Sequence, residues 1–176
     1  MPIAAVRLSD ALPQELEDLF LEHWQMLHRT AYAITGHRQD AEDVLQSIFV
    51  RLLQRGITPE VKEHPARYLH RAAVNLSLNT VRTRKRQRLI DGVELLEVPA
   101  GEAASRDAGD TQRRLMAAIA QLKPRLVEIL ILRYEHNYSD AEIAQMLGSS
   151  RGTVAVTLNR TRARLKKLME TAGETR

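Results

Sequence analysis

Few side chains in this 176-residue sequence have the type and spacing that catalysis or metal binding requires. The chain has no cysteine, which excludes disulfides, thiolate nucleophiles and cysteine-based zinc sites. Its six histidines never occur four residues apart, the spacing that places two ligands on one helix face. Asp40, Glu42 and Asp43 cluster at an expected helix start, where the helix dipole explains them better than acid–base chemistry does. We therefore predict no catalytic residue, no metal and no cofactor, and expect the protein to act by binding.

Residues 75–88, NLSLNTVRTRKRQR, combine amide side chains with a dense basic run. Asn75 and Asn79 are one helical turn apart, and five of the seven residues from Arg82 to Arg88 are basic. Amides can hydrogen-bond an unstacked base, and a basic surface can follow the phosphates of a single strand. Such a run is often only the solvated end of a helix. The lack of any interleaved acidic residue favours a nucleic-acid contact.

The pattern of residues 139–167 is typical of a helix-turn-helix. Ser139 and Glu142 have the spacing of a capping box, which predicts a helix start. Gly148 then marks the helix end, where a positive φ suits glycine. Either of the two serines that follow can cap a second helix. The inward side chains expected on that helix are Val154, Leu158 and Leu165.

This second helix is basic along its length, with no acidic residue from 151 to 167. A sharp two-helix corner that carries a helix of one charge sign meets the requirements for insertion into a DNA major groove. A helical pair with the same turn signals and no DNA role is the alternative for this stretch taken alone.

Apolar residues at helical spacing, with few strand-favouring runs, predict an all-α chain. A first helix is expected over 13–35. A second should be capped by Asp40 and end at Gly56. A loop over 57–64 then leads to a third helix that begins at Pro65. The buried stripe of the second helix is predicted to be Ala41, Val44, Leu45, Ile48 and Leu52.

Composition and charge divide the chain into two small helical domains and a flexible acidic linker. Residues 91–110 are dominated by Pro, Gly, Ala and acidic residues, and helices are expected to resume at Thr111. Net charge is +3 over 1–90 (13 basic, 10 acidic), −5 over 91–110 (1 and 6) and +6 over 111–176 (12 and 6). Two basic blocks favour a polyanionic partner. The N-terminus lacks a signal-peptide pattern and no segment is apolar enough to span a bilayer, so we expect a cytoplasmic protein.

These blocks, taken in order, resemble an extracytoplasmic-function (ECF) sigma factor, the small two-domain class of the sigma-70 family of bacterial transcription initiation factors. Residues 40–53, DAEDVLQSIFVRLL, resemble the region that binds the clamp helices of the RNA polymerase β′ subunit. Residues 68–86, YLHRAAVNLSLNTVRTRKR, resemble the region that recognises and melts the −10 element. Residues 122–165 resemble the domain that reads the −35 element. The resemblance extends from about Leu19 to Leu168.

The resemblance implies a non-catalytic sigma factor that directs core polymerase to specific promoters and assists DNA opening. The implied partners are core RNA polymerase (β′ clamp helices and β flap), promoter DNA and an anti-sigma factor. Polymerase contacts are expected at Asp40, Asp43 and Gln46, which are polar and opposite the buried stripe. Contacts to the −10 element are expected at Asn75, which would hold the flipped base, and at Asn79, Arg82, Arg84, Lys85, Arg86 and Arg88. Contacts to the −35 element are expected at Arg151, Thr153, Ala155, Val156, Asn159, Arg160, Arg162 and Arg164.

The sequence departs from this family in the recognition helix. Relatives typically place Lys or Arg, Ser and Arg after the GTV turn, where this chain has Ala155, Val156 and Thr157. Some base and phosphate contacts are therefore absent or replaced by apolar contacts, for which thymine methyl groups are candidates. We expect −35 binding to be weaker or to read an unusual sequence.

Two other functions fit parts of the pattern. A dimeric helix-turn-helix regulator would bind operator DNA, but it needs neither the block at Asp40 nor the run at Asn75. A helical interaction module could use its basic patches on an acidic protein. Such a module would neither retain core polymerase nor produce promoter-specific transcripts, so these two observations would exclude it.

Overall fold

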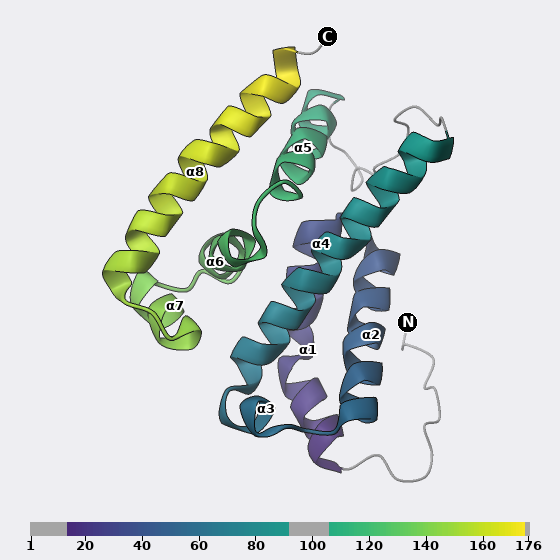
Figure 1. The fold of residues 1–176 in the computed structure, drawn as a ribbon, viewed down its shortest axis with the longest axis vertical. Helices are drawn as coiled ribbons and strands as arrows, with labels where there is room; N and C mark the ends of the chain where they lie inside the picture. Colours follow the sequence, from purple (N-terminus) through teal and green to yellow (C-terminus); the bar gives the residue numbers. More distant parts are fainter. Residues whose placement is uncertain (1–13, 92–105, 175–176) are drawn as a thin grey trace.

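The computed structural model describes residues 14–91 and 106–174, and within these ranges all regular secondary structure is helical (Figure 1). The predicted all-α fold is therefore confirmed. No helix in the described ranges is long and apolar enough to cross a membrane. The helices are α1 (Gln14–Thr35), α2 (Arg38–Arg55), α3 (Pro59–Glu63), α4 (Pro65–Asp91), α5 (Arg106–Ile119), α6 (Pro124–Tyr134), α7 (Asp140–Leu147) and α8 (Arg151–Glu174).

Helices α1, α2 and α4 form a three-helix bundle that makes up most of the N-terminal half (Figure 1). The stripe predicted for α2 is buried in full: Ala41, Val44, Leu45, Ile48 and Leu52. Leu27 and Ala31 of α1 and Leu69 of α4 join it in one apolar cluster, each with no exposed surface. Burying a large aliphatic side chain contributes about 1.5–3 kcal/mol, so this cluster fixes how the three helices pack.

The start of α2 differs from the prediction. The helix begins two residues before Asp40, with His37 as its N-cap, so Asp40 lies in the first turn instead of capping it. The α1–α2 connection explains the shift, because Thr35 Oγ1 accepts a 3.4 Å hydrogen bond from the His37 amide and sets the turn before the helix. Gly36 supplies the required left-handed backbone, with φ of 68°.

Part of the loop expected over 57–64 is helical. The short helix α3 begins at Pro59, whose fixed φ suits the first helical position. Val61 is only 1% exposed and anchors α3 to the bundle. Helix α4 begins at Pro65 as predicted and carries the basic run of the sequence to Asp91.

The C-terminal half is built around α8, which packs on α5, α6 and α7 (Figure 1). Helix α5 begins at Arg106, ahead of the predicted Thr111. A 2.6 Å ion pair between Asp110 and Arg114, at the i, i+4 spacing that supports helices, belongs to this early helix. Residues 92–105, the main part of the expected linker, and the side chain of Arg88 lie outside what the structure describes.

The two halves share a hydrophobic core. Helix α4 packs on α6 and α7. Ile34, Val74 and Leu78 of the N-terminal half are each at most 1% exposed and belong to the same apolar cluster as the core of α6–α8. In this arrangement the C-terminal domain is docked on the α1 and α4 surface of the N-terminal domain.

Candidate nucleic-acid interface

Helices α7 and α8 form the predicted helix-turn-helix with the predicted cap. The Ser139 hydroxyl accepts a 3.3 Å hydrogen bond from the Glu142 amide, and the Glu142 carboxylate accepts a 2.7 Å hydrogen bond from the Ser139 amide. The side-chain and backbone hydrogen bonds with Ser139 lower the pKa of the Glu142 carboxyl. Gly148 ends α7 in the left-handed region, with φ of 61°. Ser150 caps α8, because its Oγ accepts the Thr153 amide at 3.1 Å.

The first half of α8 has one face held in the core and one face open to solvent. Val154 and Leu158 are each 1% exposed and fix the helix against the domain. Val156 is 50% exposed, and Thr157 is half-buried. The exposed side chains of this segment that were predicted to contact DNA are Arg151, Thr153, Ala155, Val156, Asn159 and Arg160.

Arg162 and Arg164 lie further along α8 and are also exposed. The Arg162 guanidinium lies 5.8 Å from the centroid of the Tyr134 ring. It also lines a shallow hollow between α5 and α8 with Leu165 and Met169. The structure therefore places Arg162 on the α5 side of the helix, apart from the open face of the first half.

The outer side of α4 brings some of the predicted −10 residues into a row that begins at Asn75 and Asn79, whereas Arg84 turns toward Asp40 of α2. Asn75, Asn79, Lys85 and Arg86 are exposed. The two asparagines point to the same side, because residues four apart on a helix are neighbours. Their amides are therefore accessible to a base from solvent.

Arg82 follows Asn79 on this side of α4, but its guanidinium binds the other domain. Its Nε donates to the Ala120 carbonyl at 3.1 Å and its Nη2 donates to the Leu122 carbonyl at 3.0 Å. These carbonyls follow the C-terminal end of α5, where unpaired acceptors and the negative end of the helix dipole favour a cation. Arg82, which was predicted to contact DNA, therefore binds backbone carbonyls of the C-terminal domain in this structure.

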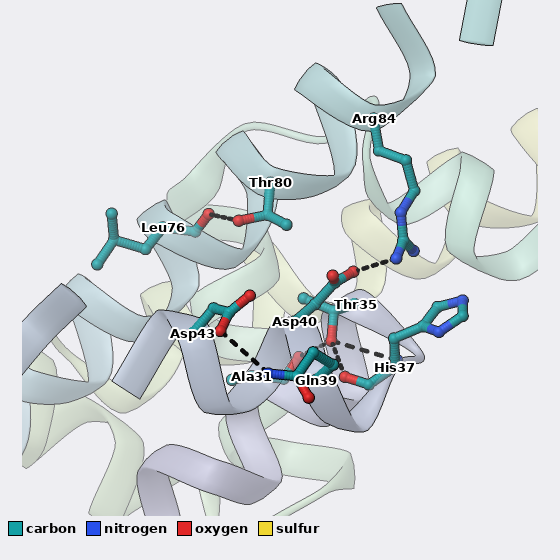
Figure 2. Close-up of polar contacts among 9 residues, drawn as sticks. All are labelled: Ala31, Thr35, His37, Gln39, Asp40, Asp43, Leu76, Thr80 and Arg84. Atoms are coloured by element: carbon teal, nitrogen blue, oxygen red, sulfur yellow. Dashed lines mark hydrogen bonds and ion pairs between the residues drawn. The ribbon is translucent and has the colours of Figure 1, made fainter. Parts of the chain in front are cut away.

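The outer face of α2 carries two of the three predicted polymerase contacts. Asp43 and Gln46 are exposed and line a shallow polar hollow with Val50 and Gln54. Asp40 lies apart from them, with only 17% of its side chain exposed, and forms a 2.6 Å ion pair with Arg84 of α4 (Figure 2). The structure therefore joins one predicted polymerase residue to one predicted −10 residue.

Polar contacts between the domains involve residues that the sequence did not single out. Arg29 Nε lies 3.0 Å from Glu135 Oε1, and a second guanidinium nitrogen donates to the Glu135 carbonyl. Thr30 Oγ1 lies 2.8 Å from His136 Nε2. Each pair is 106 residues apart in sequence, so no local pattern could have indicated it.

His70 is buried where the domains meet, with its ring centroid 5.8 Å from that of His136. Burial, and then the neighbouring His136, lower the pKa of His70 to about 3. Burial, followed by the charge of Arg29, also lowers the pKa of His136. Both rings are therefore neutral at neutral pH. In the described part of the chain no three His, Cys, Asp or Glu residues gather in a way that could hold a metal ion.

Two family models match the chain in the order of its domains. Sigma-70 region 2 matches residues 19–87, which cover α1 to most of α4. Sigma-70 region 4 matches residues 112–165, which cover the domain containing the helix-turn-helix.

Curated relatives match across both domains. The RNA polymerase sigma-E factor of Streptomyces coelicolor is 31% identical over 153 residues, 87% of this chain and 85% of that protein. The ECF RNA polymerase sigma factor SigM of Mycobacterium tuberculosis is 29% identical over 153 residues, 87% of this chain and 76% of that protein.

Two solved structures have the same fold at low sequence identity. The first is the sigma factor RpoE in complex with the anti-sigma factor NepR from Bartonella quintana. It has a TM-score of 0.51 and 21% identity, and the match covers 89% of this chain and 98% of that chain. The second is CnrH in complex with the cytosolic domain of CnrY. It has a TM-score of 0.53 and 21% identity, and the match covers 92% and 91%.

Proposed function

Because this chain belongs to the ECF sigma factors of the sigma-70 family, we propose that α4 and α8 are its two promoter contacts and α2 its polymerase contact. As a member of that family it is a promoter-directing factor of transcription initiation, and sigma factors are not themselves catalysts. The proposed roles follow the domains: residues 1–90 for polymerase binding and the −10 element, and 111–176 for the −35 element.

The exposed face of α2 suits a helical protein partner. Asp43 and Gln46 are one turn apart beside the exposed Val50, so the face offers a carboxylate, an amide and an apolar contact. The β′ clamp helices of core polymerase are the proposed partner. Asp40 is proposed to support polymerase binding indirectly. Its ion pair with Arg84 holds the start of α2 against the basic end of α4.

The row on α4 suits a melted promoter strand. Extruding a base costs a few kcal/mol, which hydrogen bonds to its edge can offset. Asn75 is the proposed base contact and Asn79 its neighbour. Lys85 and Arg86 are exposed and would bind backbone phosphates directly. Arg82 and Arg84 would reach phosphates only by leaving the Ala120 and Leu122 carbonyls and the Asp40 carboxylate, respectively. Arg88 is assigned here from the sequence alone.

The open face of α8 suits duplex DNA with thymines in the −35 element. Arg151, Asn159 and Arg160 offer phosphate and base-edge donors around Ala155 and Val156. The exposed valine would cover thymine C5-methyl groups. Replacing a contacted thymine by deoxyuridine removes one methyl, worth about 0.8 kcal/mol, so affinity should fall about fourfold. Val156→Ala should reduce this sensitivity, and equal sensitivity in both proteins would contradict the assignment.

Two further features of the family are proposed for this chain. One solved protein of the same fold, RpoE, is a sigma factor in complex with an anti-sigma factor, which supports an anti-sigma partner here. The cytoplasm is the proposed location, because core polymerase and promoter DNA are the proposed partners.

The observation that carries the proposal is the combination of an exposed Asn75–Asn79 row on α4 with an open recognition face on α8 in one chain. The test is run-off transcription of genomic DNA with core polymerase, followed by mapping of the start sites. Transcripts from a defined promoter set, dependent on this protein, are expected. Binding to operator-like duplexes without core polymerase, and no new transcripts, would instead favour a self-standing helix-turn-helix regulator.

A further inference from the structure

Two arginines of α6, neither of them among the predicted DNA contacts, hold α7 at its two ends. Arg125 lies in the first turn of α6, and its Nη2 donates to the carbonyl of Leu147, the last residue of α7, at 3.2 Å. Arg133 lies in the last turn, and its Nη1 donates to the carbonyl of Tyr138, just before α7 begins, at 3.0 Å. Helices α6 and α7 therefore run antiparallel, and α6 fixes both ends of the first helix of the helix-turn-helix.

The hydrogen bond of Arg125 lies at the turn between α7 and α8. A helix leaves its last carbonyls without partners inside the helix, and the negative end of its dipole favours a cation there. In α7 the Ala144 carbonyl accepts the Ser149 amide at 2.8 Å, and the Leu147 carbonyl accepts from Arg125 instead. The Leu147 carbonyl belongs to the peptide group that leads into Gly148, where the left-handed backbone turns the chain toward α8. The guanidinium thus binds the first peptide group of the turn.

Glu128 holds the guanidinium of Arg125 in place. Its Oε2 lies 2.8 Å from Arg125 Nη1, and only 3% of the Glu128 side chain is exposed. Within the described residues, its other oxygen, Oε1, is buried and accepts no hydrogen bond. A buried carboxylate is costly unless an opposite charge compensates it, so Glu128 depends on Arg125. The ion pair in turn keeps the second guanidinium nitrogen within reach of the Leu147 carbonyl.

The turn determines where the open face of α8 meets DNA. Val154 and Leu158 hold α8 against the domain, but the chain enters the helix from the end of α7. The exposed Arg151 and Thr153 follow Leu147 by only four and six residues. Side chains that bind a ligand must be held to within about 0.5 Å of their productive positions. A change in the turn is therefore expected to displace the first DNA contacts of α8.

We propose that Arg125 is a positioning residue for −35 recognition: held by Glu128, its guanidinium fixes the α7–α8 turn and so the direction in which α8 enters the major groove. This inference rests on the function proposed for α8. Arg125 acts through the Leu147 carbonyl and does not bind DNA itself. Glu128 takes part although it is buried, because it orients the guanidinium.

Two conservative substitutions test this role. Arg125→Lys keeps a positive charge beside Glu128, but one ammonium nitrogen replaces the two guanidinium nitrogens that bind the carboxylate and the carbonyl. Glu128→Gln keeps the arginine and removes the charge that orients it. Arg114→Lys is the matched control, because Arg114 forms a 2.6 Å pair with Asp110 on α5, away from the α7–α8 turn (Figure 1).

The turn can be measured in the full chain without DNA or polymerase. Amide hydrogen exchange followed by NMR reports the opening of the hydrogen bond from Ser149 to Ala144. Arg125→Lys and Glu128→Gln should each speed exchange at Ser149 about fivefold, a part of the effect of a hydrogen bond from a charged donor. Amides in the middle of α2 should exchange as in the native chain, and so should Ser149 in Arg114→Lys. Native exchange at Ser149 in both test variants would overturn the role of Arg125 at the turn.

The effect on −35 recognition is measured with the full chain bound to core polymerase. Affinities for promoter duplexes with the mapped and with a scrambled −35 element are compared, and their ratio isolates the −35 contribution. Both test variants should lower this ratio about fivefold at a temperature well below their melting points, whereas Arg114→Lys should keep the native ratio.

A direct phosphate contact by Arg125 would give a different result. Lysine would replace it with little loss, and Glu128→Gln would free the arginine and raise affinity. Either result would overturn the positioning role, and so would lowered melting temperatures together with the native ratio, which would show an effect on stability alone. A native chain that binds both duplexes equally would instead contradict the function proposed for α8.

Discussion

Asp40 and Arg84 form a 2.6 Å ion pair that connects the first turn of α2 to the basic end of α4 (Figure 2). Sequence reasoning assigned these residues to different partners, Asp40 to the polymerase and Arg84 to DNA. The pair shows that the two proposed surfaces share one electrostatic contact. A change at either residue is therefore expected to affect the other surface.

The ion pair should contribute measurably to stability. With 17% and 31% of the two side chains exposed, the pair is partly shielded from solvent, and a coupling of about 1 kcal/mol is expected. A double-mutant cycle of Asp40→Asn and Arg84→Gln, followed by urea denaturation, measures it. The exposed i, i+4 pair of Lys166 and Glu170, with atoms 3.8 Å apart, serves as control and should show less coupling. Additive effects of the two substitutions would contradict a stabilising pair.

Acid should destabilise the protein through His70. Its pKa is about 3 in the folded protein and near 6.5 when unfolded, so between these values the unfolded state binds more protons. Stability is unaffected above pH 6.5 and falls as pH drops below it, by about 2 kcal/mol between pH 7 and pH 5. His70→Leu should remove this loss, whereas the exposed His64→Leu should retain it. Equal pH slopes for the two variants would show that His70 is not the titrating group.

The turn of the helix-turn-helix depends on one glycine. Gly148 has a left-handed backbone, with φ of 61°, which a residue with a Cβ adopts only at a cost in free energy. The added Cβ would also lie 3.1 Å from an Arg67 guanidinium nitrogen. Gly148→Ala should cost about 1–2 kcal/mol, mostly from the backbone because the arginine can move. Gly152→Ala is the control, since its added Cβ meets nothing closer than 3.9 Å inside the helix, and it should be neutral or stabilising. Thermal melts of both variants decide the matter, and equal effects would refute the backbone argument.

The helix-turn-helix was also the part most readily predicted from the sequence. The capping box, the glycine and the serine cap act within a few residues of each other, so local rules suffice. The buried stripe of α2 follows from helical period alone. The predicted start of α2 was wrong. Asp40 is a residue type that often caps helices, but the connection from Thr35 makes His37 the N-cap instead.

The arrangement of the domains was not predictable in this way. The two hydrogen bonds of Arg82 join residues 38 and 40 positions apart. A basic run in a sequence indicates a polyanion partner, and no pattern within it shows that one arginine finds backbone carbonyls in the same chain. The same limit applies to His70, whose burial comes from packing between domains.

The recognition helix should gain affinity from basic side chains at the positions where it departs from its relatives. Ala155 is exposed and Thr157 half-buried, so Ala155→Lys is the simpler change and Thr157→Arg the second. Each new phosphate contact should strengthen binding to the mapped −35 site and steepen the dependence of log K on log salt by about 0.9. Ala117→Lys adds the same charge at an exposed position on α5 and should change neither the affinity for the −35 site nor the salt dependence. Unchanged affinity and unchanged salt slope in the α8 variants would contradict the assigned face.

The role of α4 in holding the melted promoter strand is tested most directly by run-off transcription with core polymerase on a mapped promoter. The comparison is between the native chain and Asn75→Ala. Gln25→Ala, an exposed amide on α1, is the matched control. Asn75→Ala should lower transcription from duplex DNA at least tenfold and recover most of it on a template with a pre-melted −10 region. Gln25→Ala should match the native chain on both templates. Equal activity of Asn75→Ala and the native chain on duplex DNA would contradict the proposal that α4 holds the melted promoter strand.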